Sequence, residues 1–459
     1  MIVVSHRGPV SFQRADDGTF TARRGAGGVV SALDPLLRGR DDATWIAAAI
    51  GDDDRAAVQA DAVSVPGLAV ELLALDPETH RLHYDVISNQ ILWFCFHGLF
   101  DSAREPVFDA ALHEAWDAYR AINRAFAEAV AATAAPGDVV LVQDLQLLLV
   151  AGYLAELRPD VAVTHFTHTP FGSPSELAML PDAVTAEIFA SLTAAPAGFH
   201  TEHWVHAFRL CLHERGNGDG ADAFATTFGP DAPSLRDVAA GDAAATAGAS
   251  LAERVGDRRC IVRTDRLELS KNIVRGFLAF EELLTTRPAW REQVSFVAML
   301  NPSRESLATY RDYRSEVETV AARINDRFGR GDWEPVVVDT RDDFPRSVAA
   351  LQRADVLLVN PVRDGLNLVA MEGPLLNERD AVLCLSREAG AFDLLREHAV
   401  EVQPFDVSQT AAALDAALAM DTDERAARAI GLRTAALAHP ADRWLDDLVH
   451  RARPARTAD

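Results

Sequence analysis

The chain has 459 residues, about three times the length of a typical domain. Nearly half of them are apolar and no low-complexity tract is present, so the length permits two large domains or three ordinary ones. The 44 basic and 68 acidic residues give a net charge of −24, which argues against a binding surface for nucleic acids or anionic membranes. Any anionic ligand must therefore be bound by a local cluster of cations.

The basic residues are almost all arginine. Only one lysine is present, Lys271, in the stretch RLELSKNIVRGFLAFEELL. A composition rich in Ala, Arg, Asp and Gly is typical of a GC-rich genome, so codon bias accounts for the scarcity of lysine but not for the retention of this one. Lysine presents a compact point charge and arginine a planar fork, so the two are not interchangeable where a phosphate is met end-on. Lys271 is therefore a candidate ligand, and the alternative is a solvated residue at a helix start.

The four cysteines are far apart and form no CxxC pair. Each lies in or beside an apolar run, which predicts buried free thiols in a reducing compartment. The opening MIVVSHRGP predicts a strand and not a signal peptide, and no apolar stretch reaches transmembrane length. We therefore expect a cytoplasmic protein. The sequence leaves the oligomeric state open, a homo-oligomer included.

Strands and helices alternate along the chain. Short runs rich in β-branched residues are each followed by a helical pattern, which is typical of doubly wound α/β folds with parallel sheets. After the opening strand, these runs are residues 139–144, 161–169, 260–265, 294–300, 334–340, 355–360 and 381–386.

A segment poor in large apolar residues divides the chain. Residues 230–252 are rich in Ala, Asp and Gly, and we predict a connector there. It separates an N-terminal domain, 1–235, from a C-terminal domain, 253–459, whose final amphipathic helix, about 441–453, is expected to cross back to the first domain. Two Rossmann-like domains that face each other across a cleft would bind ligands at the carboxyl ends of both sheets.

Two groups of residues in the first half follow predicted strands. Arg7 is suited to contact an anion, and the glycine-rich GAGG (25–28) lets the backbone approach a ligand closely. A simple glycine turn explains the glycines equally well. Asp144 and His168 suit hydrogen bonds to sugar hydroxyls or protonation of a leaving group. The alternative for Asp144 is a helix cap. His165 and His168 have no third ligand nearby, so no metal site is predicted.

Two further groups lie in the second half. Arg266 and Lys271 are five residues apart before a helix start, an arrangement that can bind a diphosphate without a metal ion. Asp364 and Gly365 follow an apolar strand, and Glu372 lies in the next helix, where a carboxylate can accept hydrogen bonds from a ribose diol. Neither spacing is specific on its own.

Taken together, the motifs resemble those of the trehalose-6-phosphate synthase family, retaining nucleotide-sugar glycosyltransferases with the GT-B fold. The similarity runs from the first strand to about residue 445 and is weakest between 216 and 252. The matching pieces are SHRGP, GAGGVVSAL, YDVISNQILWFCFH, the aspartate of VQDLQLL, FTHTPF, RLELSKNI, NPSR, VRDGLNLVAMEGP and LSREAGA.

The resemblance implies a donor site and an acceptor site. For the donor, Arg266 and Lys271 match the residues that bind the diphosphate, and Glu372 matches the residue that binds the ribose. Asp144 and His168 match the residues that hold the transferred glucose. The donor loops match at Gly28, Asp364, Gly365, Leu366, Asn367 and Leu368. The residues that match the glucose 6-phosphate site are Arg7, Tyr84, Trp93 and Arg304.

The mechanism that the resemblance implies needs no protein nucleophile, no metal and no cofactor. The acceptor hydroxyl attacks the face from which the nucleotide leaves, and a donor phosphate oxygen takes its proton. The implied partners are therefore only the two small-molecule substrates, nucleotide-glucose (UDP- or GDP-glucose) and glucose 6-phosphate.

Three departures from the family pattern bear on the site. The usual HDYH reads QDLQ at 143–146, the usual RLDYSK reads RLELSK at 266–271, and the usual AKE reads AME at 370–372. In the second motif an alternative register would align Arg263 and Asp265 in place of Arg266. The first departure leaves two alternatives open beside a synthase: a pseudo-glycosyltransferase that joins cyclitols, and a silent homologue that senses sugar phosphates.

Overall fold

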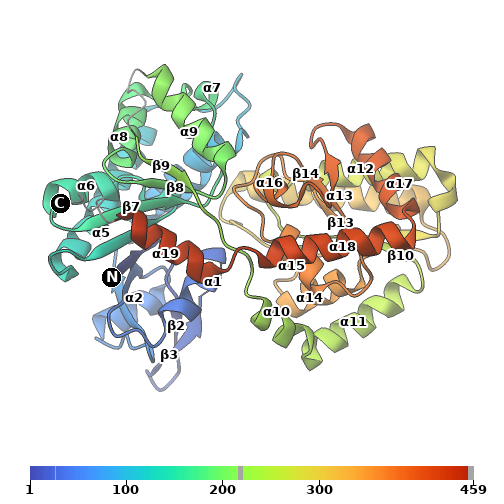
Figure 1. The fold of residues 1–459 in the computed structure, drawn as a ribbon, viewed down its shortest axis with the longest axis horizontal. Coiled ribbons are helices and arrows are strands. Elements are labelled where there is room, and N and C mark those ends of the chain that lie inside the picture. The colour runs from blue at the N-terminus through green and yellow to red at the C-terminus, as the bar shows by residue number, and fades with distance from the viewer. Residues whose placement is uncertain (26, 216–220, 453–459) are drawn as a thin grey trace, which may run out of the picture. The chain divides into compact units, whose positions relative to one another are not determined.

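The structure, a computed structural model, describes residues 1–25, 27–215 and 221–452. The chain divides into two compact units, one of residues 1–228 together with the chain from Pro440 onward, and one of residues 229–439. Each unit is built around its own parallel sheet (Figure 1). In the described part of the chain, no helix is long and apolar enough to cross a membrane.

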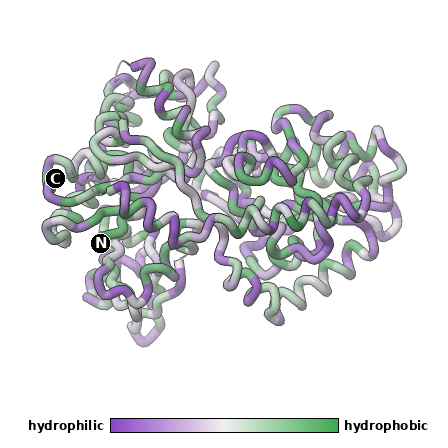
Figure 2. The backbone as a smooth tube through the Cα atoms, in the orientation of Figure 1, coloured by the Kyte–Doolittle hydropathy of each residue, from purple (hydrophilic) through white to green (hydrophobic). Residues whose placement is uncertain are grey.

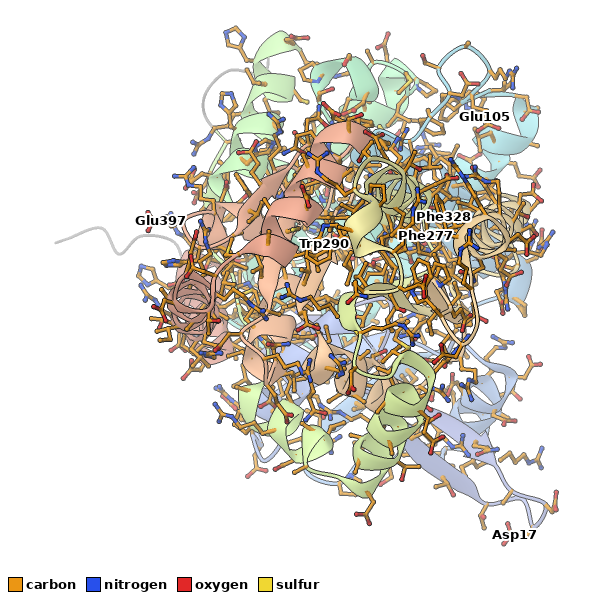
Figure 3. All side chains as sticks on the ribbon, turned by 90° about the vertical axis from the view of Figure 1, so that its right-hand side faces the viewer. Asp17, Glu105, Phe277, Trp290, Phe328 and Glu397 are labelled. Carbon is orange, nitrogen blue, oxygen red and sulfur yellow. The ribbon has the colours of Figure 1, made fainter. Side chains whose placement is uncertain are left out.

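The first unit contains a seven-stranded sheet within its described residues, in the order β5-β4-β1-β6-β7-β8-β9, and every neighbouring pair is parallel. Its strands are β1 (Ile2–Val4), β4 (Thr44–Ala48), β5 (Ala69–Leu73), β6 (Val139–Gln143), β7 (Ala162–Thr167), β8 (Ala197–Phe199) and β9 (Ala223–Ala225). A separate antiparallel hairpin, β2 (Val10–Arg14) and β3 (Phe20–Arg24), has Asp17 in its turn (Figure 3).

Helices cover this sheet. They are α1 (Gly28–Leu37), α2 (Asp52–Gln59), α3 (Pro77–Arg81), α4 (Trp93–His97), α5 (Ala110–Thr133), α6 (Val150–Leu157), α7 (Pro174–Leu177), α8 (Asp182–Leu192), α9 (Glu202–Glu214) and α19 (Ala441–Ala452), with a π-helix η1 (Leu82–Leu92) and a 3-10 helix η2 (Leu145–Leu147).

The second unit contains six parallel strands within its described residues, in the order β12-β11-β10-β13-β14-β15. They are β10 (Arg259–Arg266), β11 (Val294–Asn301), β12 (Val336–Asp339), β13 (Val356–Val359), β14 (Val382–Ser386) and β15 (Val400–Val402). The helices are α10 (Ala232–Ala239), α11 (Asp242–Val255), α12 (Ile273–Thr286), α13 (Ala308–Phe328), α14 (Phe344–Arg353), α15 (Val369–Leu376), α16 (Ala391–Leu395), α17 (Val407–Ala419) and α18 (Thr422–Leu437), with 3-10 helices η3 (Leu269–Lys271) and η4 (Pro288–Trp290).

Local sequence explains why these elements form. Central strands such as β6 and β13 consist almost entirely of buried Val and Leu, because helices cover both faces of a parallel sheet. Helices α5, α14, α17 and α18 each begin at an aspartate whose carboxylate accepts a hydrogen bond from a backbone N–H of the first turn. Figure 2 accordingly shows hydrophobic segments inside each unit and hydrophilic ones on its outside.

The predicted strands and thiols agree with the structure. All seven β-branched runs form strands within two residues of the expected bounds. The four cysteines, Cys95, Cys211, Cys260 and Cys384, are buried and free. On one face of the second sheet, Phe277 of α12 and Phe328 of α13 belong to a single apolar cluster, with Trp290 packed against it (Figure 3).

The predicted connector is corrected by the structure. Residues 230–252 form α10 and most of α11, which contact α14 and so belong to the second unit. The N-terminal segment of the first unit therefore ends at Phe228 and not at 235, and the second unit runs from Gly229 to His439 and not from 253 to 459. Alanine has the highest helix propensity, and its small side chain lets a helix pack closely without large apolar residues. The absence of such residues was therefore a poor sign of a linker.

The last helix, α19, contacts β6, β7 and α1 of the first unit (Figure 1). Trp444 is fully buried against Phe166 of β7, with 5.2 Å between the ring centroids, and against Phe228, with 4.7 Å. The Thr164 hydroxyl donates to the Leu448 carbonyl at 3.0 Å. Residue 453, the last of the predicted helix, lies outside the described residues.

Replacing Trp444 with alanine is expected to destabilise the first unit by about 3 to 5 kcal/mol, because it leaves a cavity between α19 and the sheet. Hydrogen–deuterium exchange should become faster in β6 and β7 and stay unchanged in β10 and β11. The exposed neighbour Arg443→Ala is the control. Equal exchange in Trp444→Ala and Arg443→Ala would contradict this role of α19.

Candidate active site

Each sheet reverses its strand order at one point. In the first sheet β1 lies between β4 and β6, and in the second β10 lies between β11 and β13. Open parallel sheets bind ligands at the carboxyl ends of the strands that flank such a switch point. We therefore expect the binding residues of the first unit after β1 and β6, and those of the second unit after β10 and β13.

At the switch point of the second sheet, Lys271 contacts Asp364. Lys271 ends η3 after β10, and Asp364 follows β13. The distance from Lys271 Nζ to Asp364 Oδ2 is 2.5 Å, and Asn367 Nδ2 donates to the same oxygen at 3.1 Å. Both charged side chains are mostly buried. The only lysine of the chain is therefore bound to the loop that the sequence predicts to contact the donor.

This loop, residues 364–368, is held closely. Gly390 N donates to Asp364 O at 3.0 Å, and Ala391 N donates to Leu366 O at 2.8 Å. A Cβ atom at position 390 would lie 2.0 Å from Gly365 O, so only glycine fits there. Asn367 has a φ of 74°, in the left-handed region that few residues other than glycine adopt. The loop thus has one well-defined conformation before α15 begins.

Glu372 lies in the first turn of α15 and is half-buried. Burial raises the pKa of its carboxyl to about 7. Its backbone N–H donates to Leu368 O at 2.8 Å, which ties it to the same loop. When ionised, a carboxyl in this position accepts hydrogen bonds from a diol through both oxygens, whereas the protonated group donates through one of them.

The two registers of the RLELSK motif propose different arginines, Arg263 and Arg266, and these lie in different environments. Arg263 is fully buried in β10, where its Nε and Nη2 donate to Asp265 Oδ2 at 2.9 and 2.7 Å. Its Nη2 also donates to Lys271 O at 2.7 Å. The side chain of Arg266, in contrast, is half exposed. Arg266 is therefore the more accessible of the two arginines, and Arg263 holds the backbone of Lys271.

Arg266 belongs to a second charged cluster of this unit. Its Nη1 lies 2.9 Å from Glu268 Oε1, and Arg304 Nη1 lies 3.0 Å from the same atom. Arg304 follows β11 and also donates to the Tyr310 hydroxyl at 3.0 Å. Two predicted ligands, one for each substrate, are thus joined by a residue that was not predicted to take part.

In the first unit, Asp144 and His168 meet at the ends of β6 and β7. Asp144 Oδ1 accepts a hydrogen bond from His168 N at 3.1 Å. Asp144 has a φ of 71°, a conformation that costs free energy in a residue with a side chain. It does precede η2, as the capping alternative requires, but its side chain makes no cap hydrogen bond there.

The imidazole of His168 is bound on both sides. Its Nε2 lies 2.9 Å from Gln143 Oε1, and its Nδ1 lies 3.2 Å from His200 Nε2. Because an amide oxygen only accepts, His168 donates from Nε2 and accepts from His200 at Nδ1. His200 Nδ1 in turn lies 3.0 Å from the Thr227 hydroxyl. Burial lowers the pKa of His168 to about 3, so this chain of hydrogen bonds is formed by neutral rings.

The altered QDLQ segment is firmly anchored. The Tyr119 hydroxyl donates to Leu145 O at 2.6 Å. Gln146 O accepts from Asn123 Nδ2 at 3.1 Å and lies 2.8 Å from His83 Nε2. The departure from the family pattern therefore leaves the backbone of this strand end well supported, and Gln143 takes up a specific contact with His168.

Arg7 and Tyr84 meet beside a stack of histidines. Arg7 Nη2 donates to the Tyr84 hydroxyl at 3.2 Å. The Tyr84 ring stacks on His6 with 4.3 Å between centroids, and His6 stacks on His80 with 5.0 Å. Tyr84 lies in η1, and π-helical segments occur often at functional sites. Two of the predicted phosphate ligands are thus adjacent.

The remaining predicted residues of the first unit are Trp93 and Gly28. Trp93 begins α4 and stacks on His97 with 4.1 Å between ring centroids. Gly28 is exposed and begins α1. It takes no part in the contacts of Arg7 and Asp144 given above, and Ala26, two residues before it, lies outside the described residues.

Three residues of these clusters were missed from the sequence: Gln143, His200 and Glu268. A usable signal existed for Gln143 and Glu268, but not for His200, because the strand that it follows is too short to be recognised in the sequence. Gln143 and His200 stand at or directly after the ends of buried strands, as His168 does. Glu268 is two residues after Arg266, so in an extended chain the two side chains project to the same side. In the described residues, no group of three His, Cys, Asp or Glu side chains is arranged to hold a metal ion.

Comparison with known proteins covers nearly the whole chain. Residues 1–453 match glycosyltransferase family 20. A trehalose-6-phosphate synthase of Mycolicibacterium paratuberculosis is 33% identical over 468 aligned positions, which span 96% of this chain and 93% of the relative.

Two solved structures are similar over the same length. A UDP-forming α,α-trehalose-phosphate synthase of Burkholderia xenovorans, in complex with glucose 6-phosphate, is 25% identical with a TM-score of 0.84 and covers 99% of this chain and 100% of its own. A structure from Escherichia coli bound with UDP-2-fluoro glucose is 26% identical with a TM-score of 0.83 and covers 98% of each chain. The two parallel sheets accordingly form a GT-B-like fold, and the chain belongs to glycosyltransferase family 20.

Proposed function

We propose that this protein is a retaining glycosyltransferase that transfers glucose from a nucleotide-glucose, UDP- or GDP-glucose, to glucose 6-phosphate and gives α,α-trehalose 6-phosphate. Relatives along the whole chain carry this activity in their names, and two similar structures hold a UDP-glucose analogue and glucose 6-phosphate. The observation that carries the proposal is the contact of Lys271 with Asp364 at the switch point of the second sheet. The four buried thiols suit the reducing cytoplasm, the compartment that we propose.

On this proposal the second unit binds the donor nucleotide. Arg266 and Lys271 bind the diphosphate, and the loop of residues 364–368 contacts the phosphates and the sugar. Glu372 accepts hydrogen bonds from the ribose. Because the protein carries a net charge of −24, these two cations supply the local attraction for a dianionic ligand.

The first unit holds the sugars. Asp144 accepts hydrogen bonds from hydroxyls of the transferred glucose, and His168 adds a neutral, oriented ring beside it. Gly28 allows the loop before α1 to approach the donor closely. Arg7 and Tyr84 bind the phosphate of glucose 6-phosphate, and Trp93 contacts its ring. In the second unit, Arg304 is likewise assigned to the phosphate of this substrate.

The transfer reaction then depends on the placement of the two sugars and on the stabilisation of charge on the leaving diphosphate. The acceptor oxygen forms a bond to the anomeric carbon as the bond from that carbon to the diphosphate breaks, and the acceptor proton passes to a phosphate oxygen of the leaving group. Arg266 and Lys271 stabilise the negative charge that develops on the diphosphate. The residues hold both sugars in the reactive geometry, which replaces a protein nucleophile.

Incubation of the purified protein with glucose 6-phosphate and UDP-, GDP- or ADP-glucose tests the proposal. We expect nucleotide release in step with formation of a disaccharide phosphate with at least one donor. No turnover with any donor, alongside measurable binding of glucose 6-phosphate, would contradict it and indicate a sugar-phosphate-sensing homologue.

One observation favours a second candidate function. Gln143 contacts His168 within the proposed sugar pocket, at a position where the family commonly has another residue. A pseudo-glycosyltransferase that joins a nucleotide-activated cyclitol to an amino-cyclitol phosphate would need a changed pocket there. Turnover of such a pair in the same assay, without turnover of the glucose pair, would favour this candidate.

Lys271→Arg is expected to preserve the fold and lower kcat/KM by the equivalent of about 2 to 4 kcal/mol, because a planar guanidinium cannot take the place of an ammonium held 2.5 Å from Asp364. Steady-state kinetics measures the loss. The reverse exchange at a half-exposed arginine of the same unit, Arg327→Lys, is the control and should leave activity unchanged. Parent-like activity in Lys271→Arg would show that the lysine is incidental.

UDP binding is expected to strengthen with pH. A carboxyl with a pKa of about 7 is mostly protonated below that pH and mostly ionised above it. Ribose hydroxyls donate to the ionised form, so binding lowers the pKa of Glu372, and the affinity for UDP should rise about 3- to 10-fold from about pH 6 to about pH 8.

Calorimetric titration of parent and Glu372→Gln at each pH measures this effect. The nucleotide phosphate titrates in the same range, so the difference between the two proteins isolates the contribution of Glu372. An identical pH dependence in both would exclude the carboxyl as the ribose ligand.

A further inference from the structure

The loops that follow β10 and β11 place three donors around one oxygen atom. Arg266 Nη1 and Arg304 Nη1 lie 2.9 and 3.0 Å from Glu268 Oε1, and the Ser303 hydroxyl donates to it at 2.7 Å. One carboxylate oxygen therefore joins the arginine assigned to the donor diphosphate to the arginine assigned to the acceptor phosphate.

Exposure increases outward from this carboxylate. The side chain of Glu268 is 0% exposed, that of Arg304 9% and that of Arg266 50%. Burial by itself would raise the pKa of Glu268, but the charges of Arg266 and Arg304 lower it to about 2, so the group is ionised at any physiological pH. A buried ionised carboxylate is tolerated only with its cations in place. Glu268 is thus the fixed, buried group that the guanidinium groups of both arginines contact.

The backbone fixes the cluster as well. Arg266 and Asn301, the last residues of β10 and β11, are partners in the parallel register, and Leu267 N donates to Asn301 O at 2.8 Å. Arg304, three residues further on, has a φ of 47°, a strained conformation for a residue other than glycine. Such a conformation persists where several contacts determine it, and here they include the bonds to Glu268 and Tyr310.

We infer that Glu268 is a positioning residue that sets the places of Arg266 and Arg304 together, so that one buried carboxylate prepares the binding of both anionic substrates. The inference rests on the proposed function for the identity of the two ligands. One carboxylate between two guanidinium groups leaves a net positive charge for the phosphates and removes the repulsion that would separate the arginines.

Glu268→Gln tests this inference because the amide keeps the shape and loses the charge. We expect KM for both the nucleotide-glucose and glucose 6-phosphate to rise about 10-fold or more, and the affinity for UDP in calorimetric titration to fall by a similar factor. Glu268→Asp, which keeps the charge, should retain most of both affinities.

The chain offers a matched control in Glu281. This carboxylate is 9% exposed and pairs with two arginines, Arg323 at 2.7 Å and Arg327 at 2.9 Å, between α12 and α13. Glu281→Gln removes the same kind of charge from the same unit, so it should lower thermal stability to a similar extent and leave both KM values within about twofold of the parent.

Three outcomes would overturn the inference: parent-like KM values in Glu268→Gln, a rise for one substrate only, or equal changes in Glu281→Gln. Should Glu268→Gln fail to fold, Ser303→Ala removes the third donor to Oε1 and should raise both KM values about threefold; unchanged values would then overturn it. If the parent shows no turnover, a paired loss of UDP and glucose 6-phosphate binding in Glu268→Gln still supports the positioning role, while the proposed function fails.

Discussion

The cations of the second unit that we assign to phosphate binding are each bound by a carboxylate of the same unit. Asp364 holds Lys271, and Glu268 holds Arg266. In a chain with a net charge of −24, the overall field repels anionic ligands, so exposed cations alone would attract them only weakly. Paired with a buried or mostly buried carboxylate, each cation is fixed at one position. A diphosphate then meets charges that need little rearrangement, which is the condition for strong electrostatic stabilisation.

The first unit uses uncharged groups at the corresponding place. Burial lowers the pKa of His168 to about 3 and that of His200 well below its ordinary value, so both rings are neutral and are ordered by Gln143 and Thr227. Sugar hydroxyls both donate and accept, and oriented neutral groups beside one carboxylate suit them. The same switch-point topology thus supports two kinds of chemistry, because the residues at the strand ends differ.

The βαβ pattern predicted the strands well because buried parallel strands are continuous apolar runs. It missed β8, β9 and β15, three residues each, since such runs are too brief to stand out. It also missed β4 and β5, five residues each, in which alanine or glutamate interrupts the larger apolar residues, and the hairpin strands β2 and β3. The Ala-rich sequence of α10 and α11 predicts a connector instead of helices, because the packing of these helices depends on small side chains. Arg266 and Lys271 could be chosen by spacing and resemblance. The role of Glu268 could not, because it depends on Arg304, which lies on a different strand and meets it only in the folded sheet.

Arg263 and Lys271 show why an arginine suits one position of this segment and a lysine the other. Arg263 uses its fork to bind Asp265 twice, Asn360 once and the Lys271 carbonyl once, all within the interior. Lys271 extends a single ammonium from that anchored backbone to Asp364. A guanidinium satisfies several acceptors arranged in a plane, whereas an ammonium fits one narrow position at the end of a flexible stem. The scarcity of lysine reflects codon usage, but its position here follows from geometry: the arginine anchors the loop, and the lysine provides the point charge.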